Sequence, residues 1–241
     1  MTLLAGAAAA AASSPGSSAS CYSRAVNDWF CTAYLRDYRS ELLDATKQHL
    51  TITLAAVALG LLVALPLALL ARRQRVLESA VLAITTGLYT IPSLALFPLI
   101  VPFTGLTSRT VILGLALYSL TILVRNILEG LRAVPDEVRE SALGMGFSRT
   151  RLLLRVELPL ALPVIMAGLR IATVSTVALT TVGAIVSYGG LGNMLSDGVS
   201  SDFKAEILAA SVLCVLLAVA LDLVLVGVQR ALTPWTRVAG R

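Results

Sequence analysis

Few residues of this chain could take part in acid–base, metal or redox chemistry. The 241 residues include one histidine, His49, and three cysteines, Cys21, Cys31 and Cys214. These residues are too few and too scattered for a zinc or haem site. No pair of acidic residues has a spacing that suits catalysis. We therefore predict no catalytic residue, no metal site and no cofactor held by this chain.

The two lysines exclude one further activity. Lys47 is followed by Gln48, and Lys204 is followed by Ala205. A Walker A loop needs Lys followed by Ser or Thr behind a glycine-rich turn. The chain cannot bind ATP in that manner, so any energy that it uses must come from another subunit or from a gradient.

The most informative segment reads GLRAVPDEVRESALGMGFSRTRLLLRVELPLALP, over residues 130–163. Pro135 and Asp136 suit the first turn of a helix, where a fixed φ and a negative charge are both favourable. Gly146 is placed to end that helix, and Ser148 can cap the next one. The segment predicts a compact helix–glycine–helix element whose small residues allow close approach by a partner surface.

The composition shows where such an element must lie. Hydrophobic residues make up 57% of the chain and charged residues 14%, and the mean hydropathy is +0.85. Soluble domains are less apolar and more charged than this, and disordered chains are far less hydrophobic. We infer an integral membrane protein. In this class a net charge of +5 reports arginines retained in cytoplasmic loops, so no nucleic-acid partner is expected.

Long uncharged runs predict the membrane spans. Each is long enough to cross about 30 Å of hydrocarbon as a helix, and none alternates as a barrel strand would. Three prolines, at positions 92, 98 and 102, predict that the second span is kinked or broken. The fold class is an all-α polytopic bundle of about five spans, at residues 50–71, 79–108, 110–128, 160–186 and 205–228.

The distribution of basic residues predicts the orientation. One side of the membrane carries Arg72, Arg73, Arg75, Arg125, Arg132, Arg139, Arg149, Arg151, Arg155, Arg230, Arg237 and Arg241. The other side carries only Arg24, Arg36, Arg39, Lys47, Arg109 and Lys204. The positive-inside rule places the N-terminus outside and the C-terminus in the cytoplasm.

These assignments divide the chain into three parts. We expect an extracytoplasmic tail over residues 1–49, a transmembrane domain over 50–230 and a cytoplasmic tail over 231–241. The loop at about 132–159 then faces the cytoplasm. The alanine-rich first 20 residues fit a disordered outer tail. A signal peptide is the alternative, but it fits less well because no basic residue precedes the apolar run.

The loop contains a pattern that resembles the EAA loop of ABC importer permeases. That pattern is E-A-A, three residues, G, nine residues, then I, any residue and L-P. The chain departs from it only by a serine for an alanine and a valine for the isoleucine. The matching residues are Glu140, Ser141, Ala142, Gly146, Val156, Leu158 and Pro159. An interfacial helix without a partner is the alternative interpretation of this segment.

Other segments are similar to permeases of the glycine betaine/carnitine/choline importers. They are residues 54–73, TIPSLAL at 90–96, ELPLALPVIMAGLRIATV at 157–174 and GGLG at 189–192. Methionine importer permeases share the loop and a turn like GGLG, and the TIPSLAL segment favours the osmolyte branch. The resemblance implies the type I ABC importer permease fold and import of a small osmolyte such as glycine betaine, choline, carnitine or proline.

The resemblance also implies the partners. In such importers two permease chains pair, two ATPase subunits bind ATP and Mg²⁺ and dock on the EAA loops, and an extracytoplasmic binding protein delivers the solute. The second permease chain is identical or a paralogue. A secondary transporter or channel would need no ATPase, but the EAA loop and the lack of a visible inverted repeat argue against both.

Polar residues inside the spans have two possible roles. Thr173, Ser175, Thr176 and Thr180 either line a translocation path or serve helix packing, as small hydroxyl residues often do in membranes. Arg170 is either functional or a structural arginine that snorkels or binds carbonyls. Asp222 could pair with a basic group in the bundle.

Two cysteines lie close together on the predicted outer side. Cys21 and Cys31 enclose the segment CYSRAVNDWFC, in the compartment where disulfides persist. We predict a disulfide between them and a reduced Cys214, the alternative being free thiols in a loose tail.

Overall fold

The computed structural model describes residues 20–237, and every regular element within that range is helical. The prediction of an all-α bundle is confirmed. In chain order the elements are α1 (Thr32–Asp37), α2 (Arg39–Ala71), α3 (Arg75–Thr90), α4 (Ser93–Thr104), α5 (Ser108–Arg132), α6 (Asp136–Gly144), α7 (Arg149–Leu152), the π-helical turn η1 (Leu153–Glu157), α8 (Leu158–Thr180), the 3-10 turn η2 (Thr181–Val186), α9 (Leu191–Ser200), α10 (Lys204–Leu232) and the 3-10 turn η3 (Pro234–Arg237).

Four continuous helical runs are long and apolar enough to cross a membrane: α2, α5, Arg149–Val186 and α10. Helices α3 and α4 pass the same test only as a pair bent by 99°, which is either a fifth, broken span or a re-entrant loop. The break falls at Pro92, because the residue before a proline is driven out of the helical region and Ile91 is extended. Counted as one broken span, the pair gives the five spans of the sequence-based prediction.

Helix α5 is the centre of the bundle and packs between α2 and α8. Its contact with α2 is close because α2 presents small residues there. A side chain at Gly60 would collide with Ser119, and Ala64 and Ala68 are fully buried in the same core as Leu123. Small residues at helix crossings let the backbones approach, which is how helices associate in lipid.

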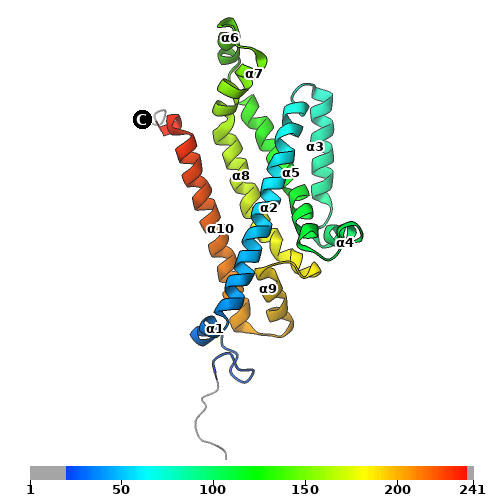
Figure 1. Cartoon of the computed structure of the whole chain (residues 1–241), viewed down its shortest axis with the longest axis vertical. Helices are drawn as coiled ribbons and strands as arrows, with labels where there is room; N and C mark the ends of the chain where they lie inside the picture. Colours follow the sequence, from blue (N-terminus) through cyan, green and yellow to red (C-terminus); the bar gives the residue numbers. More distant parts are fainter. Residues whose placement is uncertain (1–19, 238–241) are drawn as a thin grey trace, which may run out of the picture.

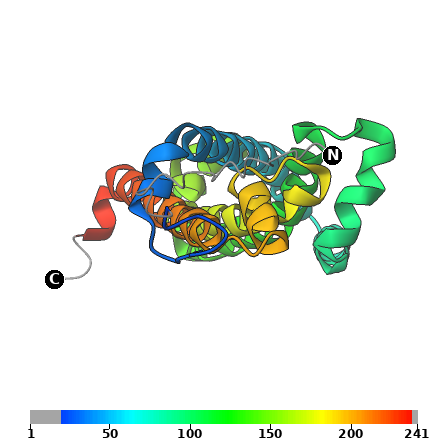
Figure 2. The same ribbon diagram turned by 90° about the horizontal axis from the view of Figure 1, so that it is seen from below.

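Helix α10 and the α3–α4 pair flank this core on opposite sides. Figure 1 shows α10 along one edge of the bundle and α3 along the other, and the view from below in Figure 2 gives the same arrangement. Only 11% of the apolar window of α10 is buried in the chain. Most of α10 is therefore free to meet lipid or another protein.

The helix that contains the first predicted span is longer than that span. It begins at Arg39, whereas the predicted span begins at residue 50. His49 is buried and its ring Nε2 lies 3.0 Å from the carbonyl oxygen of Val177 in α8. The charged residues before position 50 hid this extension in the sequence. Residues 1–19 lie outside the described range.

The segment before α2 folds against the start of α10. Cys21 and Cys31 form a disulfide, with their Cα atoms 5.6 Å apart. Tyr34 stacks on Tyr38 with ring centroids 4.6 Å apart, and burial raises the pKa of Tyr34. The side chain of Asn27 accepts a hydrogen bond from the Lys204 N–H at 3.1 Å. This cluster closes the end of the molecule opposite α6 and α7 (Figure 1).

Candidate functional site

The 132–159 loop folds as a short helical hairpin that projects beyond the other helix ends. Figure 1 shows α6 and α7 at the extreme of the long axis, next to the C-terminal end of α10. Asp136 and Glu137 occupy the first turn of α6, after Pro135. The negative charges complement the helix dipole there. The predicted helix start is thus found at the expected residues.

The turn between α6 and α7 is set by Gly146. Its φ is +83°, a conformation that glycine adopts without strain. The Phe147 N–H donates to the Ala142 carbonyl at 3.1 Å, and the Gly146 N–H donates to that of Leu143 at 2.9 Å. This pair of bonds is the Schellman motif. The Ser148 hydroxyl then accepts from the Arg151 N–H at 3.3 Å and caps α7.

The surface of α6 is the least covered part of the loop. Ala142 is its one buried residue, while Val138, Leu143 and Met145 are exposed apolar side chains beside it. We call these three the α6 apolar patch. A Cβ placed on Gly144 or Gly146 would meet no atom within 4 Å. Exposed apolar groups in a polar loop mark an interaction surface.

The structure places the seven EAA-pattern residues at two ends of the hairpin. We call the α6–α7 end its tip, and the end where residues 156–159 join α8 its root. Ala142 is buried, and the three residues that flank it at the tip, Glu140, Ser141 and Gly146, are exposed. The remaining three are half-buried where the hairpin joins α8: Val156, Leu158 and Pro159. The pattern therefore joins an exposed tip to the first turn of a membrane span.

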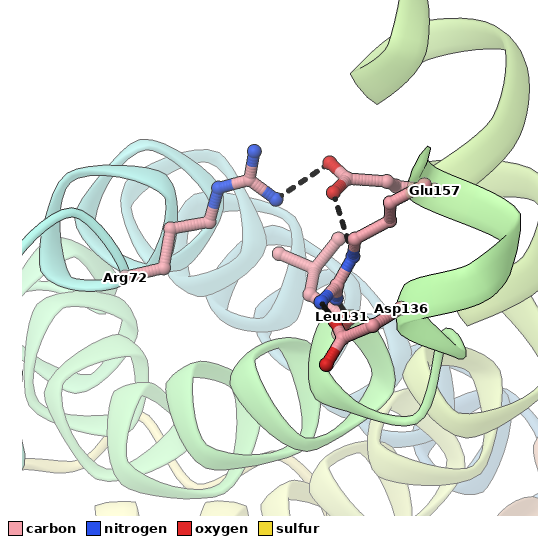
Figure 3. Close-up of polar contacts among 5 residues, drawn as sticks. Arg72, Leu131, Asp136 and Glu157 are labelled. Atoms are coloured by element: carbon pink, nitrogen blue, oxygen red, sulfur yellow. Dashed lines mark hydrogen bonds and ion pairs between the residues drawn. The ribbon is translucent and has the colours of Figure 1, made fainter. Parts of the chain in front are cut away.

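A buried carboxylate fastens the root. Glu157 is only 4% exposed, and one of its oxygens accepts from Arg72 at 2.7 Å. Its other oxygen lies 3.1 Å from Nε of Arg139 in α6. Figure 3 shows Glu157 placed between these two groups. A carboxylate taken out of water needs such partners, because burying an unpaired charge is costly.

Arg139 extends the network to one more helix, α5, and to the start of its own helix. Its guanidinium donates to the Leu131 carbonyl at 2.6 Å and to the Asp136 carboxylate at 2.7 Å (Figure 3). Leu131 lies in the last turn of α5 and Arg72 caps the end of α2. The Glu157 network, defined as Arg72, Glu157, Arg139, Asp136 and the Leu131 carbonyl, thus connects the loop with α2, α5 and the start of α8.

Sequence reasoning missed this network. Arg72 and Arg139 counted only toward orientation, and Glu157 stood at the unspecified position of the EAA pattern. One signal was present: an acidic residue between the apolar Val156 and Leu158, directly before a membrane span. Its two basic partners are far away in sequence and no spacing rule finds them.

The intramembrane charges form a second connection. Arg170 of α8 donates to both carboxylate oxygens of Asp222 in α10, each at 2.8 Å. The expectation that Asp222 pairs with a basic group is confirmed, and its partner is the arginine that was considered separately. This bidentate pair ties the loosely packed α10 to the bundle.

Three of the four hydroxyl residues proposed for a path are buried between helices. Thr173, Thr176 and Thr180 each donate to a carbonyl of their own helix, and Thr180 lies 3.1 Å from the Thr53 hydroxyl of α2. Ser175 is half-buried. Within this chain their burial favours the packing role over the path role. Among the described residues, no group of three or more metal-ligating side chains is present.

The fold and the loop define a class: a multi-span helical membrane protein with an EAA-pattern loop. A chain of the MetNI methionine ABC transporter, solved in an inward-facing conformation, superposes with a TM-score of 0.74 at 22% identity, covering 82% of this chain and 98% of that one. At that identity the likeness shows the fold. The superposition confirms the predicted permease architecture.

Within that class the sequence comparisons identify the family. Residues 56–238 match the family described as "Binding-protein-dependent transport system inner membrane component", and the chain belongs to it. The protein is therefore a membrane transport subunit.

Several relatives carry more specific names. The osmoprotectant import permease protein OsmW of Salmonella typhimurium is 38% identical, over 83% of this chain and 96% of its own length. The choline transport system permease protein OpuBB of Bacillus subtilis is 35% identical, over 83% of this chain and 93% of its own length. The glycine betaine/carnitine/choline transport system permease protein OpuCD of the same species is 39% identical, over 80% of this chain and 85% of its own length.

Proposed function

We propose that this chain is the permease of an ATP-driven importer for a small zwitterionic or quaternary-amine osmolyte of the glycine betaine, choline, carnitine or proline class. The names of its relatives support the substrate class. Methionine is the alternative substrate, because the fold is also that of a methionine transporter. Uptake of labelled glycine betaine, choline, carnitine, proline and methionine, compared in cells with and without the chain, tests the proposal. Uptake of methionine alone would contradict it.

The α6 apolar patch carries the coupling part of the proposal. An ATPase subunit, which binds ATP and Mg²⁺, docks on α6 and covers Val138, Leu143 and Met145, which the described chain leaves exposed. Glu140, Ser141 and Gly146 lie beside the patch and contact the same partner. Movement of the docked ATPase reaches the spans through the root, where Val156, Leu158 and Pro159 join the loop to α8.

Two further partners complete the importer. A second permease chain, identical or a paralogue, packs beside this one within the same bilayer. A substrate-binding protein delivers the solute at the opposite end of the molecule from α6. The sparse packing of α10 supports a further protein or lipid contact along that helix.

The proposed orientation has the N-terminus outside and the loop in the cytoplasm of a cell or inner membrane. Supporting it, the N-terminal disulfide and the 132–159 loop lie at opposite ends of the molecule (Figure 1). In intact cells a membrane-impermeant thiol reagent should label cysteine variants at Ser108 and Ser201, and not those at Gln74 and Thr236. The reverse labelling pattern would overturn the orientation.

A further inference from the structure

A cavity of about 810 Å³ lies at the loop end of the molecule. It is enclosed by the turn between α2 and α3, the last turn of α5 and the 132–159 loop. Its polar lining is dominated by five arginines: Arg72, Arg73, Arg132, Arg139 and Arg149. A concave site with this many guanidinium groups focuses a positive potential on whatever enters it.

The carboxylates in the cavity do not balance these arginines. Glu157 is shared by Arg72 and Arg139, and Glu78 pairs with Arg132. No ion pair or hydrogen bond joins the side chain of Arg73 or Arg149 to any other residue within 20–237. Asp136 also pairs with Arg139, so two positive charges are in excess, and the guanidinium groups of Arg73 and Arg149 are available to a ligand.

The remaining wall of the cavity is apolar. Leu69, Leu128, Leu131 and Leu153 line it, from the ends of α2 and α5 and from the π-helical turn. Arg72, Arg73 and Arg132 follow directly after the apolar runs of α2 and α5, and Arg149 begins the helical run of the next span, positions that suit contact with lipid headgroups. A basic rim over an apolar wall suits a molecule with an anionic head and a hydrocarbon body.

We propose that this cavity binds the phosphate group of an anionic membrane lipid, with Arg73 and Arg149 as its principal ligands. The planar guanidinium fork matches phosphate oxygens bidentately. Basic pockets between spans are a recurrent type of lipid headgroup site. A free phosphate ion offers the same chemistry but would leave the leucine wall uncovered and most of the volume unfilled.

A docked protein is the other occupant to consider. The cavity lining contains none of the three residues of the α6 apolar patch. A partner that covers the patch therefore uses a different surface, and the lipid site is independent of the proposed ATPase contact. The two assignments can fail separately.

Retention of lipid by the purified full-length chain tests the proposal. The chain in neutral detergent is titrated with phosphatidylglycerol, with phosphatidylcholine and with inorganic phosphate, and bound molecules are counted by native mass spectrometry. We expect phosphatidylglycerol to bind more tightly than the other two. Equal binding of both lipids, or phosphate binding as tight as the anionic lipid, would overturn the lipid assignment.

Two double variants locate the site. R73Q/R149Q removes the available guanidinium groups and should weaken phosphatidylglycerol binding about tenfold or more, since each basic group contributes substantially near an anionic surface. R75Q/R151Q is the matched control, because both arginines are exposed, lie two positions away and do not line the cavity. The control should change affinity less than about twofold.

Equal losses in the two double variants would show a general charge effect and contradict the site. Thermal unfolding of both variants, measured beside the unmodified chain, separates lost binding from lost folding. Unchanged lipid binding by R73Q/R149Q together with loss of a co-purifying ATPase would assign the cavity to protein docking instead.

Discussion

The two ends of the molecule hold their non-spanning segments in different ways. At the loop end, the Glu157 network ties α2, α5 and α6 together by ion pairs, while the α6 apolar patch remains uncovered. At the opposite end, a disulfide, stacked tyrosines and the Asn27 contact hold the segment against its own chain, while Trp29 and Phe30 stay exposed. One end is fixed by charged groups where a projecting hairpin meets the spans, whereas the other is fixed by a disulfide and ring stacking.

This contrast indicates which end transmits motion. A projection that is firmly joined to several spans and exposes apolar side chains can pass a partner's movement into the membrane. The opposite end also exposes apolar side chains, Trp29 and Phe30, but they lie on a segment that is held by a disulfide and is not tied to several spans by ion pairs. The variants below test the contrast, from the largest expected loss of uptake to the smallest.

The two largest effects are expected for Glu157→Gln and for Gly146→Leu. Loss of the Glu157 charge leaves Arg72 without a counter-ion and Arg139 with Asp136 alone, which costs about 2–3 kcal/mol when the partly exposed arginines are taken into account. Uptake by Glu157→Gln should fall about tenfold or more. Substrate uptake per membrane-inserted chain, quantified by immunoblot, is the measurement.

Glu129→Gln is the control for this change. Glu129 is an exposed glutamate near the end of α5, outside the Glu157 network. Its uptake should stay within about twofold of the unmodified chain. Normal uptake by Glu157→Gln at normal abundance would mean that the network does not connect the loop with the spans.

Gly146→Leu should abolish uptake without removing the protein from the membrane. The positive φ of Gly146 strains any larger residue by about 1–2 kcal/mol and would redirect the turn into α7. Gly87→Leu is the control, because Gly87 lies in α3 with open space around it and no positive φ. Equal uptake by both variants would contradict a special role for this turn.

Gly144→Leu separates strain from partner contact. Gly144 has open space in the described chain and an ordinary helical φ, so leucine there should cost the isolated chain little. A loss of uptake without a loss of thermal stability would report a partner surface at the tip. Unchanged uptake by Gly144→Leu would mean that Gly146 matters for its backbone conformation and not for contact with a partner at the tip.

An intermediate effect is expected for Asp222→Asn. The variant removes the charge of the Arg170–Asp222 pair, which holds α10 to α8 at about one-third exposure. We expect a small loss of thermal stability and a reduction of uptake to about one third. Combining it with Arg170→Gln should cost less than the two single effects added together. Fully additive losses would show that the two residues act independently.

The smallest effect on uptake is expected for Cys31→Ser. The disulfide joins cysteines ten positions apart, and its loss should lower the free energy of unfolding by about 2–3 kcal/mol in the chain-entropy description. Thermal stability should drop while uptake per folded chain stays nearly unchanged. In the unmodified protein, alkylation without reduction should leave Cys21 and Cys31 unlabelled. Two labelled cysteines in that peptide would contradict the disulfide.

Local sequence patterns predicted the fold of the 132–159 loop, but they did not predict side-chain contacts between residues far apart in sequence. Gly146 and Ser148 set a turn and a cap within a few residues, so the hairpin follows from neighbouring sequence. Glu157 depends on Arg72, which is 85 positions away, and no periodicity reports such a pair.

Two other features were only partly predictable, for different reasons. The start of α2 at Arg39 was missed because span prediction stops at charged residues, whereas a helix can continue beyond the bilayer. The polarity of Thr176 and Thr180 suggested a path, but a hydroxyl that bonds its own helix is equally suited to a packed interface.

The most direct test of the central claim is crosslinking from the tip of α6 in native membranes. A photoreactive probe is attached to a cysteine at Leu143, in the α6 apolar patch, or at Val199, an exposed residue of α9 near the opposite end. Crosslinked products are identified by mass spectrometry. The account predicts an adduct with a Walker-motif ATPase subunit from Leu143→Cys alone. No such adduct from Leu143→Cys, or an equal amount from Val199→Cys, would contradict it.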